Sequence, residues 1–401
     1  MASKNGRVGV WLLGAFGGVG ASLALGISAL KHRLTRPVGL ATACDPFSRL
    51  PFVDYDALVL GGHEVRQSDF RAAAVDLHRT TNVFSTALLT ECAPDLEAWS
   101  ANVRPGLLRR SGRPVEAFSN WDGVPRDLPV IEQAERVAKD IREFTDRNAL
   151  DYTIVANVSS SEPMPKTGFE GLSWNELSGR LQSADGPLPA SAVYALAAIE
   201  AGAGYINFTP SQGLSLAGLE ERALELGAVY CGKDGKTGET LMKSVLAPMF
   251  AQRNLHVHSW VGHNILGNRD GLVLQDQDNK QGKLQAKDRL LAEILGYEPQ
   301  TLVSIEYIAS MGDRKTAWDH VHFEGFLGTP MTLQFIWQGC DSLLAAPLLL
   351  DLVRWTELSH RRGEKGCLKH LASYFKSPMH VADHDFAHQR RMLEEYAASV
   401  R

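Results

Sequence analysis

The chain has 401 residues, 44% of them hydrophobic and 22% charged, which excludes wholesale disorder and leaves room for roughly two or three domains. Asp and Glu number 46 against 41 Lys and Arg, a net charge of −5 that argues against nucleic acid or a membrane surface as a partner, because both are polyanions. The five cysteines are widely spaced without a CxxC pair, so we expect a reducing, cytoplasmic compartment and no metal site.

Residues 8–30 carry no charge, as in a signal peptide or a membrane span. Six of these 23 residues are glycine, however, and glycine is costly in a continuous helix. The apolar run 8–13 is typical of a β-strand, and a glycine-rich turn and a helix to Lys31 follow it. We therefore expect a soluble strand–turn–helix unit here.

Short apolar runs alternate with helical segments up to about residue 240. The expected elements are strands at 38–43, 57–60, 154–157 and 204–207, mostly helical sequence over 66–150, and a helix over 191–201. This alternation is typical of an α/β fold with a parallel sheet. Beyond residue 240 the pattern changes to β-like runs at 256–261, 302–308 and 331–337, a helix over 288–295 and an apolar helix over 341–360.

The turn after the first strand carries glycines at positions i, i+3 and i+6, namely Gly14, Gly17 and Gly20. A pyrophosphate needs close approach of backbone N–H groups at a helix N-terminus, which side chains would block. The spacing differs from G-x-G-x-x-G, but it favours a dinucleotide over a turn made only for packing. The acid that binds the ribose is either Asp45, after the second strand, or Glu64, after the third.

Two more polar, glycine-rich segments lie at 232–240 and 264–271. The first lacks the P-loop pattern, and both a phosphate cradle and an ordinary surface turn remain open for it. Lys283 and Lys287 follow the second at i, i+4 spacing, which places two ammonium groups on one helix face, either in a site or simply in solvent.

Several segments, in one order along the chain, resemble the myo-inositol-phosphate synthases. Residues 232–246 are similar to that family's GDD-x-KSGQT-x-x-KSVL, 264–271 to NHLGNNDG, 341–347 to DSLLAAP, 188–202 to IPASSLYAYAALEAG, 312–315 to GDSK and 374–378 to YWLKAP. The first 150 residues resemble the family more weakly, through the glycine turn and residues 61–64.

The resemblance implies a redox-neutral cyclisation with NAD as cofactor, and it leaves any need for a metal ion open. A hexose 6-phosphate is oxidised at C5, the C6 proton is removed, the enolate closes onto the carbonyl, and the hydride returns to give a cyclitol phosphate. An enolate beside a phosphate dianion needs several cations. The resemblance also implies a homotetramer.

The resemblance implies roles for individual residues. The catalytic set is Lys283, which would move the hydroxyl proton, with Lys287, Lys315, Lys376, Asp313 and Asn264. The cofactor set is Gly14, Phe16, Gly17, Gly18, Val19, Gly20, Glu64, Asn157, Asp234, Asn268, Asp270, Asp341 and Ser342. The substrate phosphate would lie at Thr237, Gly238 and Thr240.

The chain departs from the family pattern around the lysines. Ile265 replaces a histidine, Arg269 an asparagine, Glu239 a glutamine and Lys233 an aspartate, and the TER of the family's TANTER is lost after Asn157. Loss of a hydrogen-bonding side chain can change substrate choice. Glucose 6-phosphate, giving a six-membered ring, and fructose 6-phosphate, giving a five-membered ring, both remain open. A dehydrogenase that releases NADH and a non-catalytic NAD-binding scaffold are the alternatives.

These observations together predict a Rossmann-like NAD-binding domain with an inserted α+β domain. The first comprises residues 1–240 and is completed by 341–401. The second, residues 241–340, carries catalysis and oligomerisation.

Overall fold

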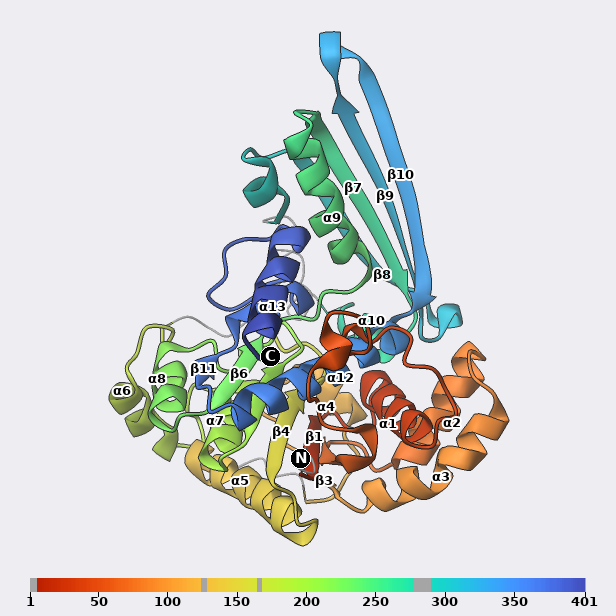
Figure 1. The fold of residues 1–401 in the computed structure, drawn as a ribbon. Helices are drawn as coiled ribbons and strands as arrows, with labels where there is room; N and C mark the ends of the chain where they lie inside the picture. The colour runs from red at the N-terminus through yellow and green to blue at the C-terminus, as the bar shows by residue number, and fades with distance from the viewer. Residues whose placement is uncertain (1–5, 124–127, 164–167, 277–289, 401) are drawn as a thin grey trace.

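The computed structural model describes residues 6–123, 128–163, 168–276 and 290–400. Within them the strands form two sheets, one below and one extending away from it (Figure 1). The strands are β1 (Val8–Leu13), β2 (Leu58–Glu64), β3 (Val103–Pro105), β4 (Tyr152–Asn157), β5 (Gly204–Asn207), β6 (Val229–Gly232), β7 (His256–Leu266), β8 (Gln300–Tyr307), β9 (Arg314–Glu324), β10 (Pro330–Cys340) and β11 (Gly366–Cys367).

Helices connect and cover these strands. They are α1 (Gly18–Lys31), α2 (Phe70–Thr81), α3 (Thr86–Ser100), α4 (Arg113–Phe118), α5 (Val130–Arg147), α6 (Trp174–Gly179), α7 (Ala190–Glu200), α8 (Ala217–Glu225), α9 (Gly238–Gln252), α10 (Arg269–Val273), α12 (Asp341–Arg361) and α13 (Phe386–Val400).

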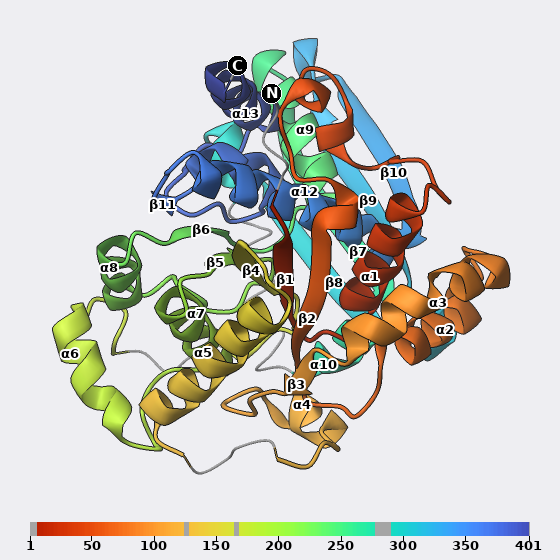
Figure 2. The same ribbon diagram turned by 60° about the horizontal axis from the view of Figure 1, so that its bottom comes forward.

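The larger sheet is parallel, with strand order β11-β6-β5-β4-β1-β2-β3. Helices α5 and α7 cover one face, and α1 and α12 cover the other (Figure 2). Burial on both faces explains why β1 is apolar along its whole length. The chain returns to this sheet after residue 340, because α12 packs on it and β11 pairs with β6. The α/β, Rossmann-like fold is therefore confirmed.

The uncharged segment 8–30 is accounted for by burial in this sheet. All six residues of β1 are buried, and so are most residues of α1, including Leu23 and Ile27. In the part of the chain that is described, no helix has the length and apolar character needed to cross a membrane.

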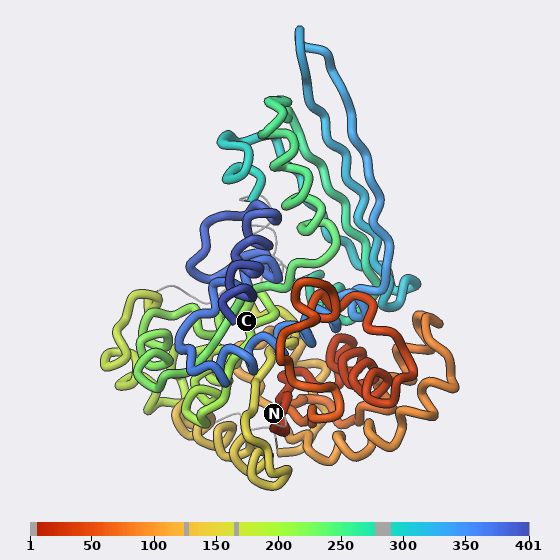
Figure 3. Tube along the Cα trace, viewed as in Figure 1, coloured from red at the N-terminus to blue at the C-terminus, as the bar shows by residue number. Residues whose placement is uncertain are grey.

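The second sheet has the order β10-β9-β7-β8, in which only the β7–β8 pair is parallel. Helix α9 packs on one face, where Ala247 and Phe250 meet Trp260 and Val321 in a small separate core. The β9–β10 hairpin runs far beyond the parallel sheet (Figures 1 and 3). The expected change of character after residue 240 thus corresponds to a change of sheet type.

The strand predicted at 38–43 is wrong. Residues 41–43 form a 3-10 turn, and the backbone N–H groups of Ala41 and Thr42 donate to the Asp351 carboxylate on α12, at 2.7 and 3.1 Å. The Asp351 carboxylate thus accepts the hydrogen bonds that these backbone N–H groups would donate to a neighbouring strand in a sheet. The strand expected at 57–60 is longer and reaches Glu64. The helix predicted over 288–295 begins outside the described residues, and 290–295 is helical.

Two buried histidines should make stability fall in mild acid. Burial lowers the pKa of His63, and it lowers that of His370 to about 3. An unfolded histidine has a pKa of about 6.5, so the unfolded chain binds more protons as the pH drops below that value. Between pH 7 and pH 5, His370 alone should remove about 2 kcal/mol from the free energy of unfolding. Urea unfolding at both pH values measures this loss.

His370→Phe is the control for this effect. The phenyl ring can keep the stacking on Tyr396, whose ring centre lies 3.6 Å from that of His370, but it cannot be protonated. The variant should lose about 2 kcal/mol less than the wild type over the same pH interval. An equal loss in both proteins would contradict the assignment to His370.

Candidate active site

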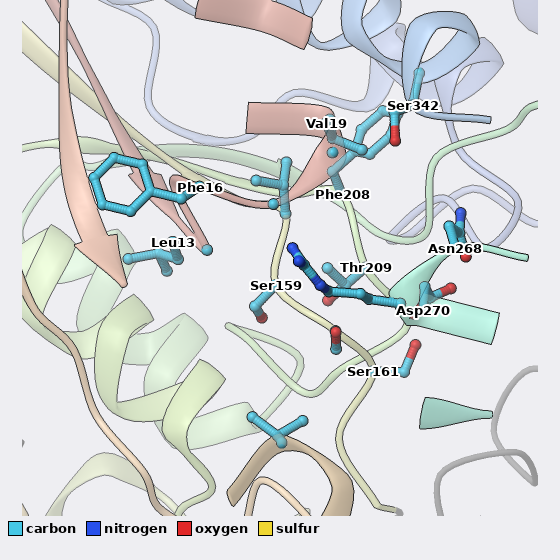
Figure 4. Close-up of a pocket in the computed structure, with 18 of the residues that line it drawn as sticks. Leu13, Phe16, Val19, Ser159, Ser161, Phe208, Thr209, Asn268, Asp270 and Ser342 are labelled. Carbon is cyan, nitrogen blue, oxygen red and sulfur yellow. The ribbon is translucent and has the colours of Figure 1, made fainter. Parts of the chain in front are cut away.

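A cleft of about 460 Å³ opens where the carboxyl ends of the parallel strands meet the second sheet. The residues that follow β1, β2, β4, β5 and β6 all contribute to its lining. Figure 4 shows Leu13 and Phe16 on one side, Asn268 and Asp270 on the other, and Ser159 and Thr209 between them. Open α/β sheets bind ligands at this edge.

The glycine turn presents bare backbone to the cleft. Gly17 precedes α1 and offers no side chain to cap it, so the first N–H groups of the helix have no partner within the helix. A Cβ on Gly18 would lie 2.2 Å from Ser342 Oγ, and one on Gly20 would lie 2.2 Å from the Ala15 carbonyl. Such a turn fits a pyrophosphate, which gains from both the N–H groups and the helix dipole.

Glu64 is the last residue of β2, and it holds the glycine turn in place through hydrogen bonds. Its buried carboxylate accepts hydrogen bonds from the backbone of Phe16 and Val65, both at 2.9 Å, and from Arg66 Nη2 at 3.1 Å. Asp45, the alternative acid, lies outside the cleft in an exposed pair with Arg49. The choice of Asp45 depended on the strand at 38–43, so it is wrong for the same reason.

The C-terminal segment brings a lysine into the cleft. Lys376 Nζ lies 2.8 Å from Asp234 Oδ1, and the backbone N–H of Lys376 donates to the Asp234 carbonyl at 2.6 Å. The next turn of the loop is held in the same way, because the backbone N–H of Lys236 donates to the Tyr374 carbonyl at 2.7 Å. Distant parts of the sequence thus position one ammonium group beside one carboxylate.

The start of α12 supplies a second polar group. Ser342 donates to Asp313 through its hydroxyl at 2.7 Å and through its backbone N–H at 3.0 Å. Burial raises the pKa of Asp313 to about 6 in spite of these bonds. Lys315 Nζ lies 3.5 Å from the neighbouring Asp341 carboxylate.

Most of the predicted site residues line the cleft. Those that do are Gly14, Phe16, Gly17, Gly18, Val19, Glu64, Asp234, Thr237, Asn268, Asp270, Asp313, Asp341, Ser342 and Lys376. Six others are not part of this lining, namely Gly20, Asn157, Gly238, Thr240, Asn264 and Lys315. Asn157, for example, supports Thr209 with a hydrogen bond of 3.2 Å. Lys283 and Lys287 lie outside the described residues.

The cleft also holds polar residues that were not among the predicted site residues. They are Arg66, Ser159, Ser160, Ser161, Glu162, Ser191, Thr209 and Arg269. Glu162 accepts the Ser191 backbone N–H at 2.7 Å and its hydroxyl, and burial raises the pKa of Glu162 to about 7. The position of such residues after a parallel strand could have indicated them, because Ser159 comes shortly after β4, as Gly14 comes after β1. Among the residues described, no group of three His, Cys, Asp or Glu side chains could hold a metal ion.

The parallel sheet, the bare glycine turn and the acid at the end of β2 define a Rossmann-like NAD-binding protein. The family model described as myo-inositol-1-phosphate synthase, an NAD-binding family, matches residues 8–397. The chain is therefore an enzyme of the myo-inositol-1-phosphate synthase family, and the resemblance seen in its sequence is confirmed.

Individual relatives agree with this membership. Inositol-3-phosphate synthase 1 of Bacteroides thetaiotaomicron is 30% identical over 423 residues, which cover 98% of this chain and 95% of that protein. Inositol-3-phosphate synthase of Mesembryanthemum crystallinum is 32% identical, and the match covers 79% of this chain but 62% of the plant protein. The crystal structure of inositol-3-phosphate synthase from Caenorhabditis elegans has a TM-score of 0.89 at 23% identity, covering 99% of this chain and 86% of that one.

Proposed function

We propose that the chain converts glucose 6-phosphate into an inositol phosphate by an NAD-dependent, redox-neutral cyclisation. The observation that carries the proposal is the cleft itself. The glycine turn of the parallel sheet, the Lys376–Asp234 pair and the Asp313–Ser342 pair line one cavity, although they are distant in sequence. A dinucleotide and a sugar phosphate could therefore lie side by side.

Bound NAD would supply a hydride acceptor that later gives the hydride back. The residues of the chain must then stabilise the negative charge that forms when the C6 proton leaves and the C6–C1 bond closes. Lys376 lies in the cleft with 14% of its side chain exposed, so its charge is poorly screened by water. We assign the enolate and aldol oxygens to Lys376, with Lys287 as its partner.

Three more roles follow from the same assignment. Lys283 would take the C5 hydroxyl proton during oxidation and return it during reduction. Asp313 and Asp341 would orient Lys315, since Lys315 contacts Asp341 and the Asp341 backbone N–H donates to the Asp313 carbonyl. Thr237 lines the cleft and would bind the substrate phosphate together with Gly238 and Thr240, which lie in the first turn of α9 directly after it.

Membership of the family and similarity to inositol-3-phosphate synthases favour glucose 6-phosphate over fructose 6-phosphate. The departures from the family pattern divide into two groups. Arg269 and the residues that replace TER, Val158, Ser159 and Ser160, line the cleft. Ile265, Glu239 and Lys233 lie outside its lining, so replacement of the family histidine by Ile265 does not change that lining.

We also propose that the chain is a cytoplasmic homotetramer that assembles through the second sheet. The face of that sheet opposite α9 exposes apolar side chains, among them Leu302 at 54% and Ile336 at 63%. An apolar sheet face of this kind is commonly covered by another subunit. The five free cysteines agree with a reducing cytoplasm.

Incubation with NAD and each hexose 6-phosphate tests the proposed reaction. Glucose 6-phosphate should give an inositol phosphate of unchanged mass, identified by NMR, without a steady rise in absorbance at 340 nm. Fructose 6-phosphate should give no carbocycle. A steady rise at 340 nm would instead identify a dehydrogenase, and NAD binding without any product would identify a scaffold.

A further inference from the structure

Arg269 enters the cleft from the wall opposite the glycine turn. It is the first residue of α10, shortly after the end of β7, whereas Gly17 and Gly18 lie at the start of α1 on the parallel-sheet side of the cleft. The backbone around Arg269 is fixed, because the Asn268 side chain accepts the Gly271 N–H at 2.9 Å. The family segment that this region resembles has asparagine in place of Arg269, so the cation belongs to this chain's own version of the cleft.

The contacts of Arg269 leave its guanidinium available. Its Nη2 lies 3.5 Å from Asp76 Oδ2, which is long for a guanidinium–carboxylate bond, and 55% of its side chain is exposed. The nearby Arg66 is used differently, since its Nη2 donates to the Phe16 carbonyl at 2.6 Å and to Glu64 at 3.1 Å. Arg66 therefore holds the glycine turn in place, whereas Arg269 lines the same cleft next to Asp76.

An anion bound between Arg269 and the glycine turn would be stabilised by positive charge on both sides. Burial and the nearby Arg66 lower the pKa of Arg269, which is the expected result of two cations at one end of a cleft. The bare N–H groups at the start of α1 add partial positive charge from the other side. A phosphate group there would receive bonds from both walls.

We propose that Arg269 binds the diphosphate of the dinucleotide and closes the cleft over it, an inference that rests on the NAD assignment above. The other phosphate source would be a 2′-phosphate on the adenosine ribose. The buried carboxylate of Glu64 lies at the end of β2, where that ribose binds in this fold, and it would repel such a group. The diphosphate is therefore the phosphate that fits.

Isothermal titration calorimetry of Arg269→Asn, which installs the family residue, tests the proposal. Loss of a charged hydrogen bond to phosphate should weaken NAD and ADP-ribose binding by roughly 10- to 100-fold, with adenosine binding unchanged by NMR titration. Arg79→Asn is the matched control, because Arg79 also contacts Asp76, at 2.7 Å, but lies outside the cleft and is 78% exposed. It should bind NAD as the wild type does.

Asp76→Asn separates a direct from an indirect role. If Arg269 binds phosphate, removing its carboxylate neighbour should leave NAD affinity equal or higher. A loss in Asp76→Asn as large as that in Arg269→Asn would show that Arg269 acts through the ion pair, and it would overturn the proposal. A greater loss for 2′,5′-ADP than for 5′-ADP in Arg269→Asn would overturn it too. Failure of the wild type to bind NAD would refute the proposed function instead.

Discussion

Lys376→Met should lower kcat by about 10²- to 10³-fold, as expected when one preorganised donor to a developing oxyanion is removed. The methionine has a similar length but cannot hold negative charge. The change also leaves the Asp234 carboxylate, 2.8 Å away in the wild type, without this cation, so it should repel a phosphate dianion and raise KM. Product formation from glucose 6-phosphate, followed by NMR, measures both parameters.

Lys369→Met is the matched control for this variant. Lys369 lies seven residues earlier in the same segment, and its side chain is exposed and outside the cleft. Its removal should leave turnover within about twofold of the wild type. The catalytic role of Lys376 is refuted if Lys376→Met keeps half of the wild-type kcat while Lys369→Met behaves as expected.

Local patterns in the sequence predicted the part of the site that is local in the fold. The strand, turn and helix of residues 8–31 are one contiguous unit. The glycines of the turn indicate directly that another group approaches the backbone closely. Glu64 was found for a similar reason, because it follows the apolar run 57–60 that was predicted to be a strand. The similarity of short segments to a family then added Lys376 and Asp234, which no periodicity could have placed together.

Features that depend on contacts between distant segments could not be predicted from the sequence. The run at 38–43 has the composition of a strand, but the Asp351 carboxylate, more than 300 residues later, captures its backbone N–H groups. In the sequence, Arg269 stands out only as a departure from the family pattern, and Ser159 looks like an ordinary loop residue. Their place in one cleft becomes visible only when the two sheets come together. Pattern alone also could not show that Ile265 lies outside the lining of the cleft.

Lys243→Met should destabilise the protein by about 3–5 kcal/mol, the usual cost of breaking a buried ion pair from one side. Lys243 Nζ lies 2.7 Å from Glu239 Oε1 near the start of α9, and the two side chains are 1% and 2% exposed. The Glu239 carboxylate also accepts a hydrogen bond from Asn264 at 2.6 Å. Without the ammonium group, a carboxylate would remain in a site that water hardly reaches. Urea unfolding gives the difference in the free energy of unfolding.

Lys139→Met is the control, because Lys139 and Glu143 also form an i,i+4 pair on a helix, but with side chains 72% and 49% exposed. Its loss should change stability by less than about 0.5 kcal/mol. Adding Glu239→Gln to Lys243→Met removes the stranded charge and should restore part of the stability, since an amide can still accept from Asn264. Equal small effects in Lys243→Met and Lys139→Met would show that the Glu239–Lys243 pair contributes nothing. Because Thr237 directly precedes α9, loosening this pair should also disturb the loop that lines the cleft.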